Sequence, residues 1–138
     1  MPVKLSPLVR ITLVIGAVAF LLPGMWAFFA PVGFADTIAT FEPYNRHYLH
    51  DLGAFQIGVG TAALVAVWVY DGAVVGLSGL LAGDSVHAIS HIVDRDLGGR
   101  SADAPLIALV AVLALVALIS RVRTLRRPPT TAGISAKR

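Results

Sequence analysis

Long apolar runs separated by short polar stretches set the pattern of this chain. Four such runs occupy residues 8–29, 52–70, 73–93 and 105–120. Each is close to the ~20 residues that a helix needs to cross the ~30 Å hydrocarbon layer of a bilayer. The last run is the shortest, but its LIALVAVLALVALI is unbroken. The pattern therefore predicts an all-α integral membrane four-helix bundle, with residues 1–120 forming one domain.

Basic residues gather at both ends of the chain and predict its orientation. Lys4 and Arg10 flank the first run, and six more follow the last: Arg121, Arg123, Arg126, Arg127, Lys137 and Arg138. The two stretches on the opposite side are acidic, with Asp36, Glu42, Asp94, Asp96 and Asp103 against Arg46, Arg95 and Arg100. Because Lys and Arg favour cytoplasmic flanks, both termini are expected in the cytoplasm. Residues 121–138, including PPTTAGISAKR, are expected to form a basic, flexible cytoplasmic tail.

The first run leaves a second interpretation open. Lys4 and Arg10 followed by an apolar stretch also resemble a secretory signal peptide, with Gly33-Phe34-Ala35 as a cleavage site. The run is long for the apolar part of such a signal, which favours a membrane span. Pro23-Gly24 within it predicts a kink, since proline removes one helix hydrogen bond.

Composition narrows the chemistry. The chain is 57% hydrophobic and 14% charged, which excludes an ordinary soluble domain. It has no cysteine, so disulfides, thiolate metal sites and iron–sulfur ligation are excluded. Its net charge of +3 comes mainly from the two basic flanks, so it indicates topology rather than binding to nucleic acid. No phosphate-binding loop or catalytic motif is present, which favours a protein that is not an enzyme.

The second and third runs are joined only by Tyr70-Asp71-Gly72, a turn signal that predicts an antiparallel hairpin. Small residues at helical spacing would let its two helices approach closely. In the third run this strip is Gly72, Gly76, Gly79 and Gly83, continued outward by His87, Ser90 and Asp94; in the second it is Gly58, Thr61, Ala54, Asp51 and His47. If these faces meet, the polar groups converge at the outer end.

Two polar segments mark that outer end. EPYNRHYLHDLG opens the second helix, where Pro43 and Asn45 suit a turn and a helix entry. GDSVHAISHIVD closes the third and places His87 and His91 at positions i and i+4. That spacing can present two imidazoles to one metal ion. The candidate metal ligands are His47, Asp51, His87 and His91, with Asp94 as a further or supporting ligand.

The sequence leaves open which metal ion or cofactor these residues would bind. Zinc, copper and nickel all suit imidazole and carboxylate ligands. Bis-histidine haem is less favoured, because these histidines lie near the surface.

A purely structural polar network is the alternative to a metal site. In this network Asp51 would pair with His91 and Arg46 with Asp96. Asp84 and Asp94 would be its further members. Asp84 differs from the others because it lies within the hydrocarbon, where an ionised carboxylate costs at least ~2.5 kcal/mol. It should therefore be protonated, paired or beside water. His87 is its nearest expected partner, and Thr61 or Gln56 could also contribute.

The stretch FEPYNRHYLHDLGAFQIGVG, followed by HAISH, resembles an uncharacterised actinobacterial group of small four-span membrane proteins. In that group a PYN-x-H-x-x-x-D-x-G-A segment opens the second helix and a histidine pair closes the third. The resemblance covers about residues 30–95, and the layout is similar to DoxX-like four-helix proteins. It implies a multi-pass protein of the bacterial cytoplasmic membrane. Some DoxX-like proteins are linked to quinone-dependent oxidation, but no motif here carries that activity over.

Three functional hypotheses follow. The first is an accessory or structural subunit of a bacterial membrane complex, in contact with the lipid bilayer and with other membrane subunits or copies of itself. The second is a metal- or haem-binding redox or transport component built on the His/Asp cluster. The third is a proton-coupled protein using Asp84 and His87 as a relay, which is disfavoured because four short spans leave little room for alternating access.

Overall fold

The structure, a computed structural model, describes residues 4–69, 72–97 and 100–126, and these ranges are helical with no strand. In chain order the helices are α1 (Pro7–Phe29), α2 (Pro31–Thr37), α3 (Arg46–Val65), α4 (Gly72–Val93) and α5 (Asp103–Arg126). Among them α1, α4 and α5 are long and apolar enough to cross a membrane. The prediction of an all-α protein is confirmed, and these helices indicate a multi-pass membrane protein.

The helix ends follow the local chemistry of the chain. α1 begins where the Ser6 side chain accepts a hydrogen bond from the Val9 backbone N–H at 3.4 Å, and it continues through Pro23. α3 begins after Asn45, whose Oδ1 accepts from the Tyr48 N–H at 3.1 Å, as predicted for this entry. α5 continues beyond residue 120 to Arg126, so the first part of the predicted tail is helical. The predicted turn at Tyr70-Asp71 and residues 127–138 lie outside the described residues.

α2 is a short helix that the apolar pattern did not predict. Proline at its start supplies a backbone angle suited to a first helical turn. Phe34 is buried and meets Trp26 edge to face, with ring centroids 5.8 Å apart. α2 thereby packs at the end of the molecule where α1 ends, which we call the outer end. The end where α1 begins is called the inner end.

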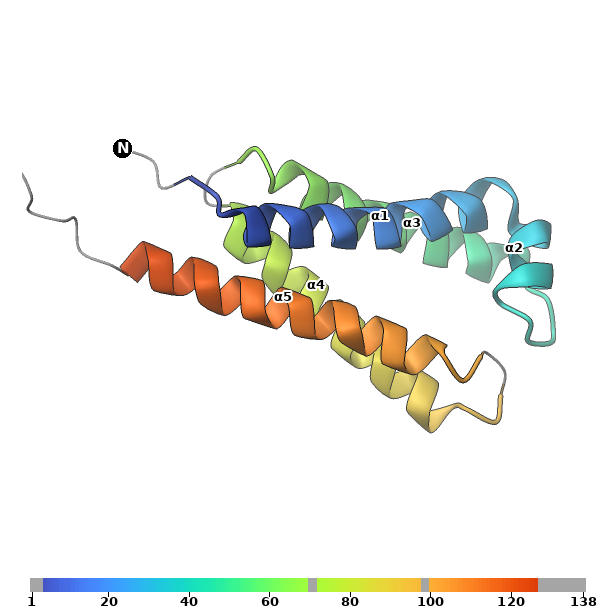
Figure 1. Cartoon of the computed structure of the whole chain (residues 1–138). Coiled ribbons are helices and arrows are strands. Elements are labelled where there is room, and N and C mark those ends of the chain that lie inside the picture. Colours follow the sequence, from blue (N-terminus) through green and yellow to red (C-terminus); the bar gives the residue numbers. More distant parts are fainter. Residues whose placement is uncertain (1–3, 70–71, 98–99, 127–138) are drawn as a thin grey trace, which may run out of the picture.

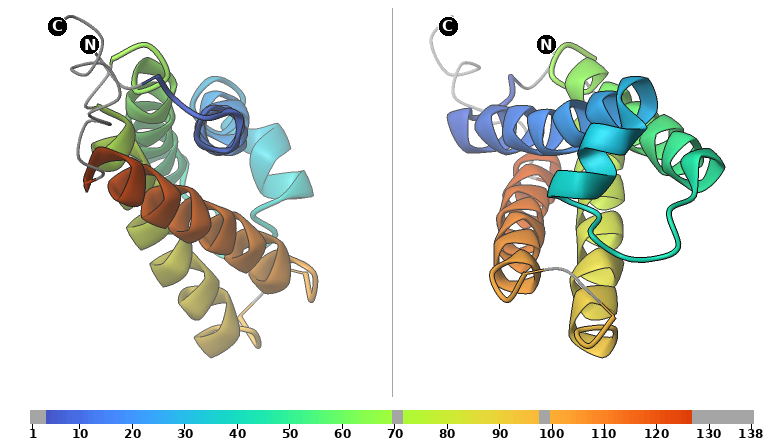
Figure 2. Two further views of the ribbon diagram at one scale, coloured as in Figure 1. Left: turned by 60° about the vertical axis from the view of Figure 1, so that its left-hand side comes forward. Right: turned by 90° about the vertical axis from the view of Figure 1, so that its right-hand side faces the viewer.

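The long helices form two antiparallel pairs, α1 with α3 and α4 with α5 (Figure 1). The α4–α5 pair crosses the α1–α3 layer at a clear angle and diverges from it toward the outer end (Figure 2). The pairs meet near the inner end, where the fully buried Leu13, Leu77 and Leu80 belong to one core cluster. The start of α1 and the end of α5 lie at this same end (Figure 1).

Three glycines allow α1 and α3 to pack with their backbones in contact. A Cβ atom added at Gly53 would lie 2.7 Å from the Gly24 carbonyl oxygen, and one at Gly24 would lie 2.8 Å from Gln56 Cβ. At Gly60 it would lie 3.0 Å from the Ala17 carbonyl oxygen. At Gly53 and Gly24 these separations are shorter than real Cβ contacts, and at Gly60 the separation is tight, so the close α1–α3 interface favours glycine at all three positions.

The glycine strip predicted between α3 and α4 is in contact over only part of its length. Added Cβ atoms at Gly72 and Gly76 would lie 3.3 Å from Ala66 Cα and 2.9 Å from Ala66 Cβ. At Gly79, and at Gly58 of α3, an added Cβ would meet no atom within 4 Å. The two helices therefore pack closely at the inner end and separate beyond it. Gly58 does not lie in a helix contact; α3 uses its Gly53 and Gly60 face, against α1.

Candidate functional site

The ionisable residues of the outer half of α4 form the candidate site. With a rise of 1.5 Å per residue from Gly72, Asp84 lies ~18 Å and His91 ~28 Å along the helix. In a helix that crosses a ~30 Å hydrocarbon layer from Gly72, His91 would lie near the far boundary and Asp84 well inside the layer. The site therefore covers the outer half of a helix that is long and apolar enough to cross a membrane.

His87 and His91 face each other across one turn of α4. Their Nε2 atoms are 3.1 Å apart and their ring centroids 4.8 Å apart. At this distance one imidazole donates an Nε2–H hydrogen bond and the other accepts it. The Ser90 hydroxyl donates to the His87 backbone carbonyl at 2.8 Å, so this hydroxyl group is hydrogen-bonded within its own helix. The two imidazoles therefore share one hydrogen bond, with a single proton between their Nε2 atoms.

The polar residues of α3 form a separate pair. His47 Nε2 lies 3.5 Å from the Asp51 carboxylate within the first turns of the helix, and both side chains are exposed. His50 points elsewhere and stacks on Phe28, with ring centroids 5.2 Å apart. All three residues lie at the start of α3, as the sequence predicted.

The structure does not bring the α3 and α4 groups into one cluster. No group of three or more His, Asp or Glu side chains able to hold a metal occurs within residues 4–69, 72–97 and 100–126. Asp51 contacts its own-helix neighbour His47 rather than His91, and Asp96 lies 3.8 Å from Arg95 rather than pairing with Arg46. The physical reason is the divergence of α4 from α3 beyond Gly76. Asp94 is exposed at the end of α4.

Asp84 is the buried member of the site. Its side chain belongs to a residue only 5% exposed, and Oδ2 has no hydrogen-bond partner among the described residues. Two of the three expected partners lie elsewhere: His87 faces His91, and Thr61 is exposed on α3. The buried Gln56 Oε1 on α3 also has no partner in the described part of the chain.

Two residues near the outer end of α5 join the site, and sequence reasoning missed both. Asp103 accepts a hydrogen bond from the Arg100 backbone N–H at 2.7 Å and is close enough to act electrostatically on His87. The Arg100 guanidinium donates to the Thr37 carbonyl at 2.8 Å, which links the α4–α5 loop to α2. The signal for Asp103 is an acidic residue just before the last apolar run, where helix starts favour one.

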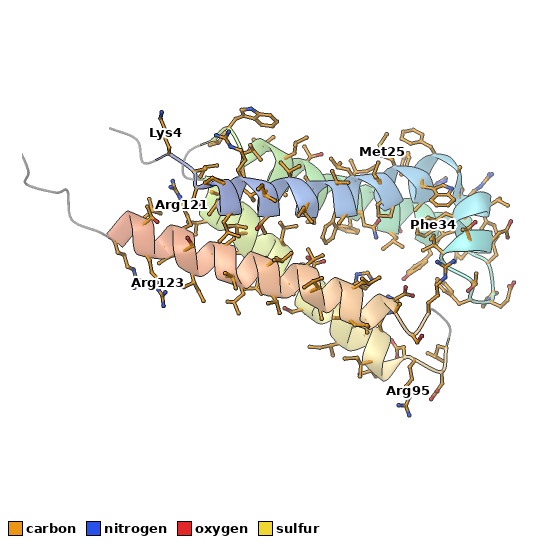
Figure 3. The ribbon with its side chains drawn as sticks, viewed as in Figure 1. Lys4, Met25, Phe34, Arg95, Arg121 and Arg123 are labelled. Atoms are coloured by element: carbon orange, nitrogen blue, oxygen red, sulfur yellow. The ribbon has the colours of Figure 1, made fainter. Side chains whose placement is uncertain are left out.

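Arg121 was also misjudged by the sequence interpretation. It was assigned to the exposed basic tail, yet it is 2% exposed and is one of the largest fully buried side chains. It rises from α5 toward the start of α1, where its Nη1 donates to the Lys4 carbonyl at 3.4 Å (Figure 3). The available signal was its spacing, because it continues the buried stripe Ala111, Ala114, Ala117. Lys4 and Arg123 lie at the same end of the molecule, whereas Arg95 lies at the other (Figure 3).

Comparison with protein-family models, with curated proteins and with solved structures finds no match to this chain. The class of protein is therefore defined by the structure itself: an all-α chain with helices that can cross a membrane. Its distinctive chemistry is a buried carboxyl group and a histidine pair on α4.

Proposed function

We propose that this chain is a four-span protein of the bacterial cytoplasmic membrane with both termini inside, and that it acts as a non-catalytic accessory or structural subunit. It would associate with other membrane helices through the glycine-bearing face of α4. The residues PYNRHYLHDLGA, which resemble a segment of small four-span proteins, agree with this layout.

The direction of the helices supports a fourth span. α1 ends at the outer end and α4 begins at the inner end, so α3 must carry the chain back between them. α3 packs along α1, and its 20 residues cover ~30 Å. The polar residues of its first turns would then lie at the outer boundary. Four spans also place Lys4 and Arg123 on one side, as the distribution of basic residues requires.

Cysteine labelling tests the topology cleanly, because the chain contains no cysteine of its own. Single replacements Arg95→Cys and Arg126→Cys place one thiol at each exposed end of the molecule. In intact cells or sealed right-side-out vesicles, a membrane-impermeant maleimide should modify the first and not the second. Permeabilised membranes, in which both should react, provide the control. Labelling of both residues in sealed vesicles, or the reverse pattern, would refute the topology.

The association role is supported by the outer half of α4, where the glycine face is not covered by the chain's own α3. Gly79 is exposed and an added Cβ would meet no atom, while at Gly83 the nearest atom would be the Phe20 ring carbon at 3.7 Å. Small residues exposed on a membrane helix permit close approach of another helix, which is what drives association in lipid. The chain's own α3 covers this face only at Gly72 and Gly76.

A double variant, Gly79→Leu with Gly83→Leu, should abolish association while the subunit stays folded, because an added Cβ makes no close contact at either position. Association is measured by light scattering and chemical cross-linking in mild detergent and in lipid nanodiscs. Val75→Leu is the matched control, since it adds bulk to an exposed position on the same helix. A wild-type chain that stays monomeric and copurifies with no membrane protein, or a double variant that associates normally, would contradict the proposed role.

A further inference from the structure

We propose that Asp84 is a proton-binding site inside the membrane, reached from the outer face of the protein through His87 and His91. This goes beyond the association role and does not depend on it. The place of Asp84 inside the membrane and the side from which the proton enters rest on the proposed topology.

The burial of Asp84 by its own chain is the first step. The residue is 5% exposed, and Oδ2 has no hydrogen-bond partner among the described residues. An ionised carboxylate so placed would lack compensation, whereas the neutral acid removes most of the cost. Because its own helices cover it, Asp84 cannot reach a lysine or arginine on a partner protein. A bound proton is the remaining counter-charge.

Among the residues that the structure describes, no cation is positioned to pair with Asp84. The effect that acts on the Asp84 carboxyl group is loss of hydration through burial, not the charge of a neighbouring ion. α1 carries Arg10 at the far, inner end, and the basic residues of α5 lie at that end too. On α3 the ionisable groups are confined to the first turns, and His47 and Asp51 face one another there. Among the described residues of the helices packed on α4, Asp103 of α5 is the titratable group that acts on His87.

The histidine pair connects this buried group to the surface. His87 and His91 follow Asp84 at i+3 and i+7, so the three lie along one side of α4. They are ~4.5 Å and ~10 Å further out along the helix axis. His91 is near the membrane boundary, and its Nε2 is 3.1 Å from that of His87. Their spacing places both histidines on the Asp84 side of α4, between that residue and the outer boundary.

Proton transfer along this side of α4 balances atom by atom. A proton from outside adds to Nδ1 of His91, which then gives its Nε2 proton to Nε2 of His87 and becomes neutral. His87, now carrying both protons, releases the one on Nδ1 to a water molecule, which passes a proton to the Asp84 carboxylate. His87 is left neutral as its Nε2–H form, and the hydrogen bond between the rings has reversed direction. Release of the proton follows the same steps backward.

Infrared spectroscopy of the full chain in lipid nanodiscs tests both parts of the proposal. At neutral pH the wild type should show the carbonyl stretch of one protonated, buried carboxylic acid, and transfer to heavy water should shift it. Asp84→Asn should remove that band, and Asp84→Glu should restore it at a slightly different frequency. Absence of an Asp84-dependent band at neutral pH would overturn the proposal.

The kinetics of the shift test the route. His87→Gln and His91→Gln should each slow hydrogen–deuterium exchange of the Asp84 band by about 100-fold, the lower range for loss of a positioned proton-transfer group. His50→Gln is the matched control, because that ring stacks on Phe28 away from α4. Circular dichroism establishes that each variant is folded. Exchange at the wild-type rate in folded His87→Gln would refute the route, even if the band itself is present.

Discussion

Replacing Gly53 with valine is expected to destabilise the protein by about 3 kcal/mol, the upper part of the usual cost of overpacking. The reason is that a Cβ at this position would lie 2.7 Å from the Gly24 carbonyl oxygen and 2.9 Å from the Phe28 backbone nitrogen. Both atoms belong to the α1 backbone, so no side-chain rotation relieves the clash. The helices must separate, and the contacts around Gly24 and Gly60 are lost with them.

Gly58→Val is the matched control on the same helix. It changes helix propensity by the same amount, but an added Cβ there meets no atom within 4 Å. The free energy of unfolding of both variants can be measured by titration with a denaturing detergent, followed by circular dichroism. We expect Gly58→Val to remain within about 1 kcal/mol of wild type. Equal losses in the two variants would mean that the α1–α3 packing does not depend on a backbone contact at Gly53.

This pair of glycines also shows why the sequence could predict the helices but not their partners. Length and apolar character alone placed the third run at residues 73–93, and α4 is Gly72–Val93. On α3, however, Gly53 and Gly60 mark one face and Gly58 another, and both faces satisfy the small-residue pattern. In a membrane helix the lipid-facing side is as apolar as the packed side, so hydropathy does not distinguish them. Proximity along the chain suggested α4, whereas the closest backbone contact is with α1.

The same ambiguity limited the prediction of the candidate site. Features within one helix were predictable, including the i and i+4 arrangement of His87 and His91 and the Asn45 helix entry. Features between helices depended on the assumed α3–α4 contact. Because α4 separates from α3 beyond Gly76, His47 and Asp51 remain a pair of their own. The sequence placed Asp84 within the hydrocarbon from its depth along the helix, whereas its burial against the chain's own helices is a finding of the structure.

Arg121→Ala should destabilise the protein by about 3 kcal/mol, comparable to truncating a large buried apolar side chain. Arg121 is 2% exposed, and its aliphatic stem packs at the inner end of the bundle while Nη1 donates to the Lys4 carbonyl at 3.4 Å. Truncation leaves a cavity and removes this link between α5 and the start of α1. Thermal unfolding in mild detergent measures the loss.

Arg123→Ala is the control, because that residue is exposed on the same helix turn and should change stability by no more than about 0.5 kcal/mol. Arg121→Met separates the two contributions, since it keeps much of the volume but removes the hydrogen bond. We expect its loss to lie between those of the alanine variants. If Arg121 were only a cytoplasmic charge that fixes orientation, Arg121→Ala and Arg123→Ala would behave alike. A difference between them therefore assigns Arg121 to the packed interior of the bundle and leaves orientation to the remaining basic residues.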